Sequence, residues 1–121
     1  MIVGIGTDLC RIARMAHATQ NEHFVRRIFS AEEIAYASGQ GNPAMHYASA
    51  YAAKEALAKA SGLGMFGMGI DASWVERTET GPEMHCTGAL WEKLQAKGVK
   101  KIWLSLTHEG DYALAFVVLE S

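Results

Sequence analysis

AMHYASAYAAKEALAKA, residues 44–60, is the stretch that decides the fold. It holds eight alanines, two lysines and one glutamate, with no glycine or proline, and this composition predicts the longest helix of the chain. Pro43 suits the first turn of such a helix, and Gly62 is expected to end it. Because alanine side chains are small, another element or a ligand can approach this helix closely.

Residues 1–9, MIVGIGTDL, are predicted to form a buried strand with two unlike faces. Side chains alternate along a strand, so one face carries the larger residues Val3, Ile5, Thr7 and Leu9. On the other face, two glycines leave room beside Asp8 for a ligand or another backbone. Asp8 is then either a ligand-binding carboxylate or the N-cap of the next helix. The glycines do not form a dinucleotide fingerprint, because Leu9 stands where the third glycine belongs.

The other elements follow from caps, turns and alternating hydrophobicity. We predict helices over 11–20, from Ser30 onward and over 89–97, and strands over 70–78, 84–87, 102–108 and 112–120. Ser30 and Glu33 have the spacing of a capping box, and Thr87 is expected to cap the last helix. Residues 62–69, with four glycines, are expected to be a mobile loop or an anion-binding turn. Mixed helices and strands without βαβ regularity indicate the α+β class.

Composition excludes several classes of protein. The 121 residues carry 11 Lys or Arg and 13 Asp or Glu, a formal net charge of -2 that argues against a generic nucleic-acid binder. Cys10 and Cys86 are too few for a disulfide framework or a Cys-rich zinc site. No targeting segment is visible, and the longest apolar run, residues 112–119, is too short to span a bilayer. The sequence therefore predicts a soluble, cytoplasmic protein.

Positive charge gathers between Cys10 and Phe29. Four arginines face the single Glu22 in this stretch: Arg11, Arg14, Arg26 and Arg27. An arginine cluster on a slightly acidic protein favours a specific acidic partner. The alternative is that these arginines simply form a solvated helix surface.

Glu55 and Lys59 are four residues apart and share one face of the predicted long helix. This spacing is typical of an exposed ion pair worth a few tenths of a kcal/mol. The same face also carries Tyr51 and small alanines, so a ligand can reach it. Both interpretations stay open from the residues alone.

Ser105 and Thr107 lie on one face of a predicted strand, and His108 stands at its end. A lone histidine in this position is either structural or catalytic. Asp111 is too near in sequence to complete a hydrolase triad with these residues, and no nucleophile elbow is present.

Three segments, in this order and at these separations, resemble one family. Residues 4–8 (GIGTD), 51–60 (YAAKEALAKA) and 105–108 (SLTH) are similar to the holo-acyl-carrier-protein synthases, the small stand-alone 4′-phosphopantetheinyl transferases. The resemblance covers the whole length, and Arg14 and residues 27–33 also fit. It implies a single domain over residues 1–121, in which a small antiparallel sheet packs on a long helix. It also implies transfer of the phosphopantetheine arm of coenzyme A to a serine of apo acyl carrier protein, with release of adenosine 3′,5′-bisphosphate.

The resemblance assigns the catalytic roles to Asp8, Glu55 and Lys59. Asp8 and Glu55 would hold Mg²⁺, a hard cation that accepts carboxylate, phosphate and water oxygens. Lys59 would reach the phosphates of coenzyme A. The chain needs no nucleophile of its own, because the carrier protein supplies the serine hydroxyl. The base that takes the serine proton is Glu55, directly or through a water, or else Lys59.

The resemblance also implies binding surfaces and an assembly. The coenzyme A pocket would be formed by Lys59, Gly62, Gly64, Ser105, Thr107 and His108. An acidic carrier protein would dock on Arg11, Arg14, Arg26 and Arg27. Members of the family are homotrimers with the active site between subunits, and the same is expected here.

The chain departs from the family pattern at three positions. Ala50 replaces a usual arginine, so the grip on the 3′-phosphate is lost or moved to His46 or His108. Arg11 stands where a glutamate is common, and the turn at Gly81-Pro82 lacks its basic residue. Two alternatives therefore remain. One is a non-catalytic module that binds coenzyme A or a carrier protein. The other is a Mg²⁺-dependent phosphohydrolase, which would leave the arginine cluster unexplained.

Overall fold

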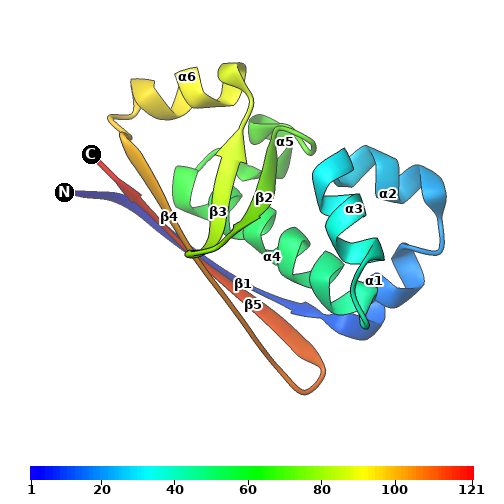
Figure 1. The fold of residues 1–121 in the computed structure, drawn as a ribbon. Helices are drawn as coiled ribbons and strands as arrows, with labels where there is room; N and C mark the ends of the chain where they lie inside the picture. The colour runs from blue at the N-terminus through cyan, green and yellow to red at the C-terminus, as the bar shows by residue number, and fades with distance from the viewer.

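The computed structural model describes residues 1–121 as two antiparallel sheets and six helices, arranged around one central helix (Figure 1). The elements in chain order are β1 (Ile2–Arg11), α1 (Ile12–Ala18), α2 (Glu22–Ile28), α3 (Ala31–Ser38), α4 (Pro43–Ser61), α5 (Gly64–Met68), β2 (Ser73–Thr78), β3 (Gly81–Cys86), α6 (Gly88–Ala96), β4 (Lys101–Glu109) and β5 (Tyr112–Glu120). The predicted α+β class is confirmed. No helix is long and apolar enough to cross a membrane.

The long helix α4 packs on the three-stranded sheet, whose strand order is β1-β5-β4. Gly4 and Gly6 of β1 face α4 at its closest approach. A Cβ atom on either glycine would clash with the carbonyl oxygen of Ala60 or Ala56. The open face predicted for β1 is therefore filled by the backbone of α4 rather than by a ligand. This packing aligns Asp8, two residues further along the same face, with the helix face that carries Glu55 and Lys59.

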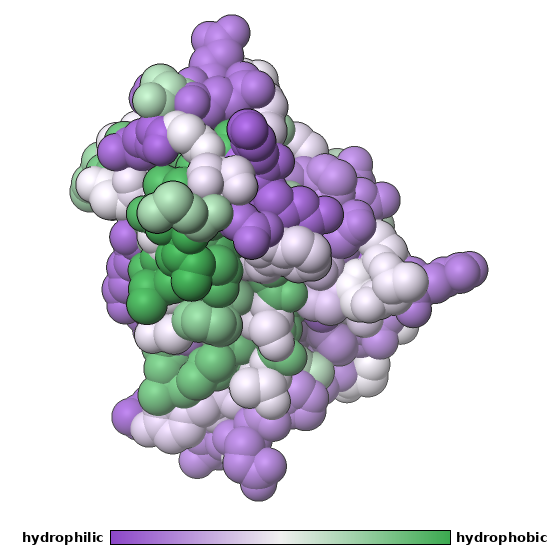
Figure 2. All heavy atoms as spheres, turned by 90° about the vertical axis from the view of Figure 1, so that its left-hand side faces the viewer, coloured by the Kyte–Doolittle hydropathy of each residue, from purple (hydrophilic) through white to green (hydrophobic).

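The opposite face of this sheet is uncovered, which corrects the prediction of a buried strand. Strand pairing places Ile5 of β1, Val118 of β5 and Trp103 of β4 side by side on this outer face. Several large apolar side chains on it are exposed: Val3, Ile5, Leu9, Trp103 and Phe116. Figure 2 shows a band of hydrophobic atoms on the side of the molecule where the chain ends lie. The predicted alternation of side chains along residues 1–9 is confirmed. Within a single chain, however, another element covers only the face that carries Gly4 and Gly6.

Most predicted helix ends are confirmed by their caps. The Ser30 hydroxyl accepts a hydrogen bond from Glu33 N, and the Glu33 carboxylate accepts one from Ser30 N, which completes the capping box. Pro43 starts α4, and Thr87 caps α6 through Leu90 N.

Two segments differ from the prediction. The region before Ser30 contains two helices instead of one, because the Asn21 side chain accepts hydrogen bonds from His23 N and Phe24 N and starts α2. Residues 62–69, expected to be a loop, contain the short helix α5. Gly62 and Gly64 adopt φ values of 74° and 71°, which turn the chain out of α4 and into α5.

Candidate active site

Asp8 and Lys59 meet where β1 crosses the last turns of α4. Lys59 Nζ lies 3.3 Å from Asp8 Oδ1 and donates a hydrogen bond to the carbonyl oxygen of Thr7 at 3.0 Å. The Asp8 side chain is only 18% exposed, whereas that of Lys59 is 57% exposed. Lys59 therefore forms its ion pair with Asp8 and not with Glu55. The N-cap alternative for Asp8 is wrong, because α1 begins after Arg11 without a side-chain cap.

Glu55 lies half-buried on α4, one turn before Lys59 and one turn after Tyr51. Burial raises the pKa of Tyr51, and so does the charge of Glu55. Arg14 acts in the opposite direction, and its guanidinium carbon lies 5.3 Å from the centre of the Tyr51 ring. The sequence placed Arg14 on a docking surface, but the structure also brings it beside the site.

Cys10 follows Asp8 on the same face of β1. It is 1% exposed, and burial raises the pKa of its thiol. The nearby Arg14 guanidinium opposes this shift, and the carboxylates of Asp8 and Glu55 reinforce it. Glu55 is tied to the Asp8–Lys59 pair by its position on α4, one helical turn before Lys59.

The carboxylate pair sets a limit on the kind of metal the site can hold. No group of three or more His, Cys, Asp or Glu side chains forms a metal cluster anywhere in the chain. Asp8 and Glu55 instead supply two oxygen donors, which fits Mg²⁺ held by one or two carboxylates together with substrate phosphates and waters.

The predicted coenzyme A residues are only partly brought to this site. Ser105 pairs with Phe116 and Thr107 pairs with Leu114, so both side chains lie on the outer face of the sheet, opposite Asp8. His108 shares the inner face with Cys10. Burial lowers the pKa of His46, and the Coulomb interactions with Arg77 and His108 lower it further. Gly62 and Gly64 follow Lys59 directly. Within one chain, therefore, Ser105 and Thr107 do not reach the carboxylates.

Comparison with known proteins decides the family. A model described as the 4′-phosphopantetheinyl transferase superfamily matches residues 4–117. The chain belongs to this superfamily. Curated relatives named holo-[acyl-carrier-protein] synthase include those of Geotalea daltonii, 39% identical over 99% of both chains, and Nitrosococcus oceani, 43% identical over 98% of this chain and 80% of the relative.

Solved structures of this transferase superfamily have the same fold. The holo-[acyl-carrier-protein] synthase of Neisseria meningitidis superposes with a TM-score of 0.91 at 35% identity over the full length of both chains. That of Bacillus anthracis, in complex with "CoA (3′,5′-ADP)", has a TM-score of 0.82 at 30% identity and covers 100% of this chain and 98% of its own. The resemblance stated from three short segments is thus confirmed over the whole chain.

The four candidate docking arginines of this transferase are all exposed, but they have different surroundings. Arg11 donates to the Tyr112 hydroxyl at 3.2 Å, and Arg26 pairs with Glu22 at 3.4 Å in a highly exposed ion pair. Arg26 and Arg27 line a surface hollow of about 300 Å³ together with Phe66, which is 91% exposed. Two arginines of α2 therefore stand beside an exposed aromatic ring.

Ala50, the first departure from the family pattern, lines a cavity of about 270 Å³. Arg77 of β2 and His46 of α4 line the same cavity, and the Arg77 guanidinium carbon lies 4.9 Å from the centre of the Tyr36 ring. Burial lowers the pKa of Arg77. A guanidinium therefore reaches the surroundings of Ala50 from another strand. The sequence named His46 as a substitute but missed Arg77, which no local pattern marks.

At the third departure, the turn at Gly81-Pro82, basic side chains also come from another part of the chain. These two residues line a groove of about 560 Å³ that also contains Lys100 and Lys101. Basic side chains thus lie across the groove from a turn that has none.

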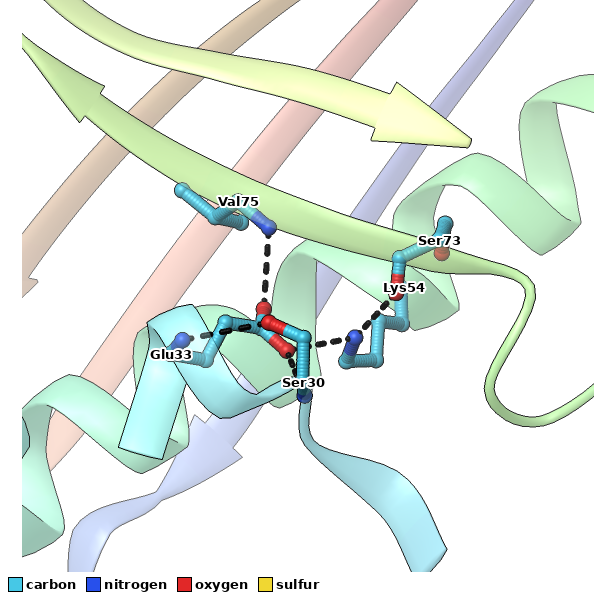
Figure 3. A network of polar contacts seen from close by, with 5 residues as sticks. All are labelled: Ser30, Glu33, Lys54, Ser73 and Val75. Atoms are coloured by element: carbon cyan, nitrogen blue, oxygen red, sulfur yellow. Dashed lines mark hydrogen bonds and ion pairs between the residues drawn. The ribbon is translucent and has the colours of Figure 1, made fainter. Parts of the chain in front are cut away.

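Lys54 stands beside Glu55 in the transferase motif and is completely buried (Figure 3). Its Nζ lies 2.9 Å from Glu33 Oε1 and also donates to the carbonyl oxygen of Ser73. The second carboxylate oxygen of Glu33 accepts a hydrogen bond from Val75 N at 2.9 Å. Burial lowers the pKa of Lys54, and the Glu33 carboxylate opposes this shift. The network joins α3, α4 and β2, and sequence analysis did not predict it.

Proposed function

We propose that this protein is a Mg²⁺-dependent holo-acyl-carrier-protein synthase. It transfers the 4′-phosphopantetheine group of coenzyme A to a serine of an apo acyl carrier protein and releases adenosine 3′,5′-bisphosphate. The observation that carries this proposal is the meeting of Asp8 and Lys59 at the contact between β1 and α4, with Glu55 one helical turn before Lys59, in a chain of the transferase superfamily. The coenzyme A complex of the B. anthracis relative supports the donor.

Each site residue has a distinct task in this reaction. The serine oxygen of the carrier attacks the phosphorus that bears the pantetheine arm, and the bond to adenosine 3′,5′-bisphosphate breaks. Mg²⁺ held by Asp8 and Glu55 would neutralise charge on the pyrophosphate. Lys59, more than half exposed, can turn its ammonium group from Asp8 to a phosphate oxygen. Glu55 accepts the serine proton, with Lys59 as the alternative base.

The coenzyme A pocket requires a second subunit. Ser105 and Thr107 lie on the outer face of the sheet, away from Asp8 of the same chain. The exposed apolar side chains of that face, Ile5 and Phe116 among them, are the kind of surface that subunit contacts cover. We therefore propose a homotrimer in which this face of one subunit, with its Ser105 and Thr107, completes the site of a neighbour beside Gly62 and Gly64. His108 would contribute to the pocket from the inner face of the sheet.

The arginine cluster fits an acidic carrier protein. Arg26 and Arg27 stand beside the exposed Phe66, so the hollow offers both positive charge and apolar surface to a partner. Arg14 lies nearest to the carboxylates and would bring a docked carrier toward Glu55. Arg11, which donates to the Tyr112 hydroxyl, is a further exposed arginine for the carrier.

Intact mass spectrometry tests the reaction directly. An apo acyl carrier protein incubated with this protein, coenzyme A and Mg²⁺ should gain the mass of one phosphopantetheine arm. The gain should disappear in EDTA and return with excess Mg²⁺. Added salt should raise the KM for the carrier protein more than the KM for coenzyme A, because only docking depends on the exposed arginines. If several carriers gain no mass while coenzyme A still binds, the chain is a non-catalytic binding module, and Ala50→Arg is the first change to try.

Phe116→Asp should separate the subunits, because it places a charge in the centre of the exposed apolar face. Light scattering should give three times the chain mass for the wild-type protein and one chain mass for the variant, and transfer activity should fall with the assembly. Phe66→Asp is the control for assembly, since this ring, 91% exposed against 38% for Phe116, lies on α5 and not on the sheet. An active wild-type monomer would refute the trimer.

A further inference from the structure

Arg77 of β2 is the only arginine of the chain that is not exposed. It lines the cavity of about 270 Å³ together with His46 and Ala50 of α4. Its side chain forms no ion pair and donates no hydrogen bond within the chain. The guanidinium nitrogens are unpaired but not enclosed, so they open onto the cavity. A half-buried charge without a partner costs free energy, and an anion in the cavity would compensate it.

Aromatic contacts hold the two basic side chains of this cavity in place. The Arg77 guanidinium carbon lies 4.9 Å from the centre of the Tyr36 ring, and the His46 ring lies perpendicular to the same ring at 5.0 Å between centres. Stacking uses the flat face of a guanidinium and leaves the N–H groups along its edge free to donate. Nδ1 of His46 is buried without a hydrogen-bond partner, and it donates to an anion when it carries the proton. The cavity therefore fits a phosphate group.

The negative charges around the cavity do not satisfy Arg77. Three glutamates line it: Glu32, Glu33 and Glu76. Glu33 is paired with Lys54 at 2.9 Å, and Glu76 Oε2 lies 2.7 Å from His85 Nε2. Glu32 and Glu76 are exposed, so water and salt screen their charges. The guanidinium of Arg77 thus stays available to an anion that comes from outside the chain.

The cavity lies beside the proposed metal site. Ala50 precedes Glu55 by five residues on α4, which is about 7.5 Å along the helix axis. One ligand can therefore reach both places. Coenzyme A, the donor in the proposed reaction, carries a phosphate monoester on its ribose in addition to the pyrophosphate that would bind Mg²⁺. This third phosphate, which stays on adenosine 3′,5′-bisphosphate after transfer, has no binding partner among Asp8, Glu55 and Lys59.

We propose that Arg77, together with His46, binds the 3′-phosphate of coenzyme A in this cavity. The proposal rests on the proposed function, from which it takes the donor. It adds that this chain selects its donor through a residue of β2, which only the packing of β2 against α3 and α4 brings to the site. Ala50 contributes space rather than charge, because its methyl group leaves the cavity open for the phosphate.

Arg77→Gln tests this proposal, because it removes the charge and leaves a polar side chain in its place. The probes are coenzyme A and dephospho-coenzyme A, which lacks only the 3′-phosphate, titrated calorimetrically with Mg²⁺ present. We expect the wild-type protein to bind coenzyme A about ten- to a hundredfold more tightly than dephospho-coenzyme A, the range for hydrogen bonds to a charged group. R77Q should bind both donors equally within twofold, with wild-type affinity for dephospho-coenzyme A. Lys97→Gln, which removes an exposed positive charge at the end of α6, should keep the preference.

Several results would overturn the proposal. A wild-type protein that binds both donors equally, or binds neither, has no such phosphate pocket. An R77Q variant that keeps the preference removes Arg77 from it, and one that binds neither donor shows that Arg77 supports the fold instead. Ala50→Arg combined with Arg77→Gln puts a guanidinium back into the same cavity and should regain a preference for coenzyme A. A double variant as unselective as R77Q would refute the cavity as the place where the phosphate binds.

The same titrations separate this proposal from the proposed function. If the wild-type protein transfers nothing but still prefers coenzyme A, and R77Q loses that preference, the proposed reaction fails and the phosphate pocket stands. If transfer proceeds with the same KM from dephospho-coenzyme A as from coenzyme A, the reaction stands and the pocket is refuted.

Discussion

Glu55→Gln is expected to lower kcat for phosphopantetheine transfer by about two to four orders of magnitude, the range for loss of a positioned acid or base. The amide has the same shape as the carboxylate, but it cannot take the serine proton and is a poorer metal ligand. The half-buried side chain keeps its place on α4, so the fold should remain intact. The loss should therefore appear in kcat rather than in the amount of folded protein.

The measurement is the rate of holo-carrier formation at saturating coenzyme A and carrier, read by intact mass. Glu92→Gln, which makes the same change at an exposed position of α6, should leave the rate unchanged. Calorimetric titration of coenzyme A should still show binding to E55Q, which would separate a chemical defect from loss of the pocket. A variant that keeps more than a tenth of the wild-type kcat would remove Glu55 from the role of base and point to Lys59.

Local patterns predicted those parts of the molecule that are determined by residues close in sequence. The alanine-rich helix, the Ser30–Glu33 capping box and the Thr87 cap all follow from such spacings. The face of β1 that carries Gly4 and Gly6 was also identified, but its occupant was not. A strand with glycines on one face admits either a ligand or a backbone, and only the tertiary packing shows that α4 fills it.

The missed features depend on residues far apart in sequence. Strand register decides that Ser105 lies on the face opposite Asp8, and register follows from the pairing of β1 with β5 and of β5 with β4. The stacking of Arg77 on Tyr36 joins β2 to α3 in the same way. Asn21 is a local signal for the start of α2 that was overlooked, since asparagine is among the best N-caps.

Lys54 is the clearest case of a residue whose role depends on distant contacts. In sequence, Lys54 is one residue of the segment YAAKEALAKA, and no local pattern marks it as buried. In the structure, the Lys54 side chain is 0% exposed, and its partner Glu33 is 2% exposed. The Glu33 carboxylate also serves Ser30 N and Val75 N, so one buried ion pair connects a helix cap, the long helix and a strand (Figure 3).

Lys54→Met should consequently destabilise the fold by about 3–5 kcal/mol, the usual cost of leaving one buried charge without its partner. Methionine fills a similar volume, so most of this loss comes from the isolated Glu33 carboxylate and the unsatisfied Ser73 carbonyl. Urea unfolding at neutral pH measures it. Arg26→Met breaks the exposed pair with Glu22 and should change stability by less than about 1 kcal/mol.

A second variant separates the charge from the packing. Lys54→Met combined with Glu33→Gln removes both charges and keeps one oxygen to accept from Ser30 N or Val75 N. It should recover part of the stability lost in K54M, because a buried amide costs less than a buried carboxylate. If the double variant is as unstable as K54M, the shape of the lysine matters more than its charge. If K54M loses under about 1 kcal/mol, the buried pair is not what joins α4 to α3 and β2.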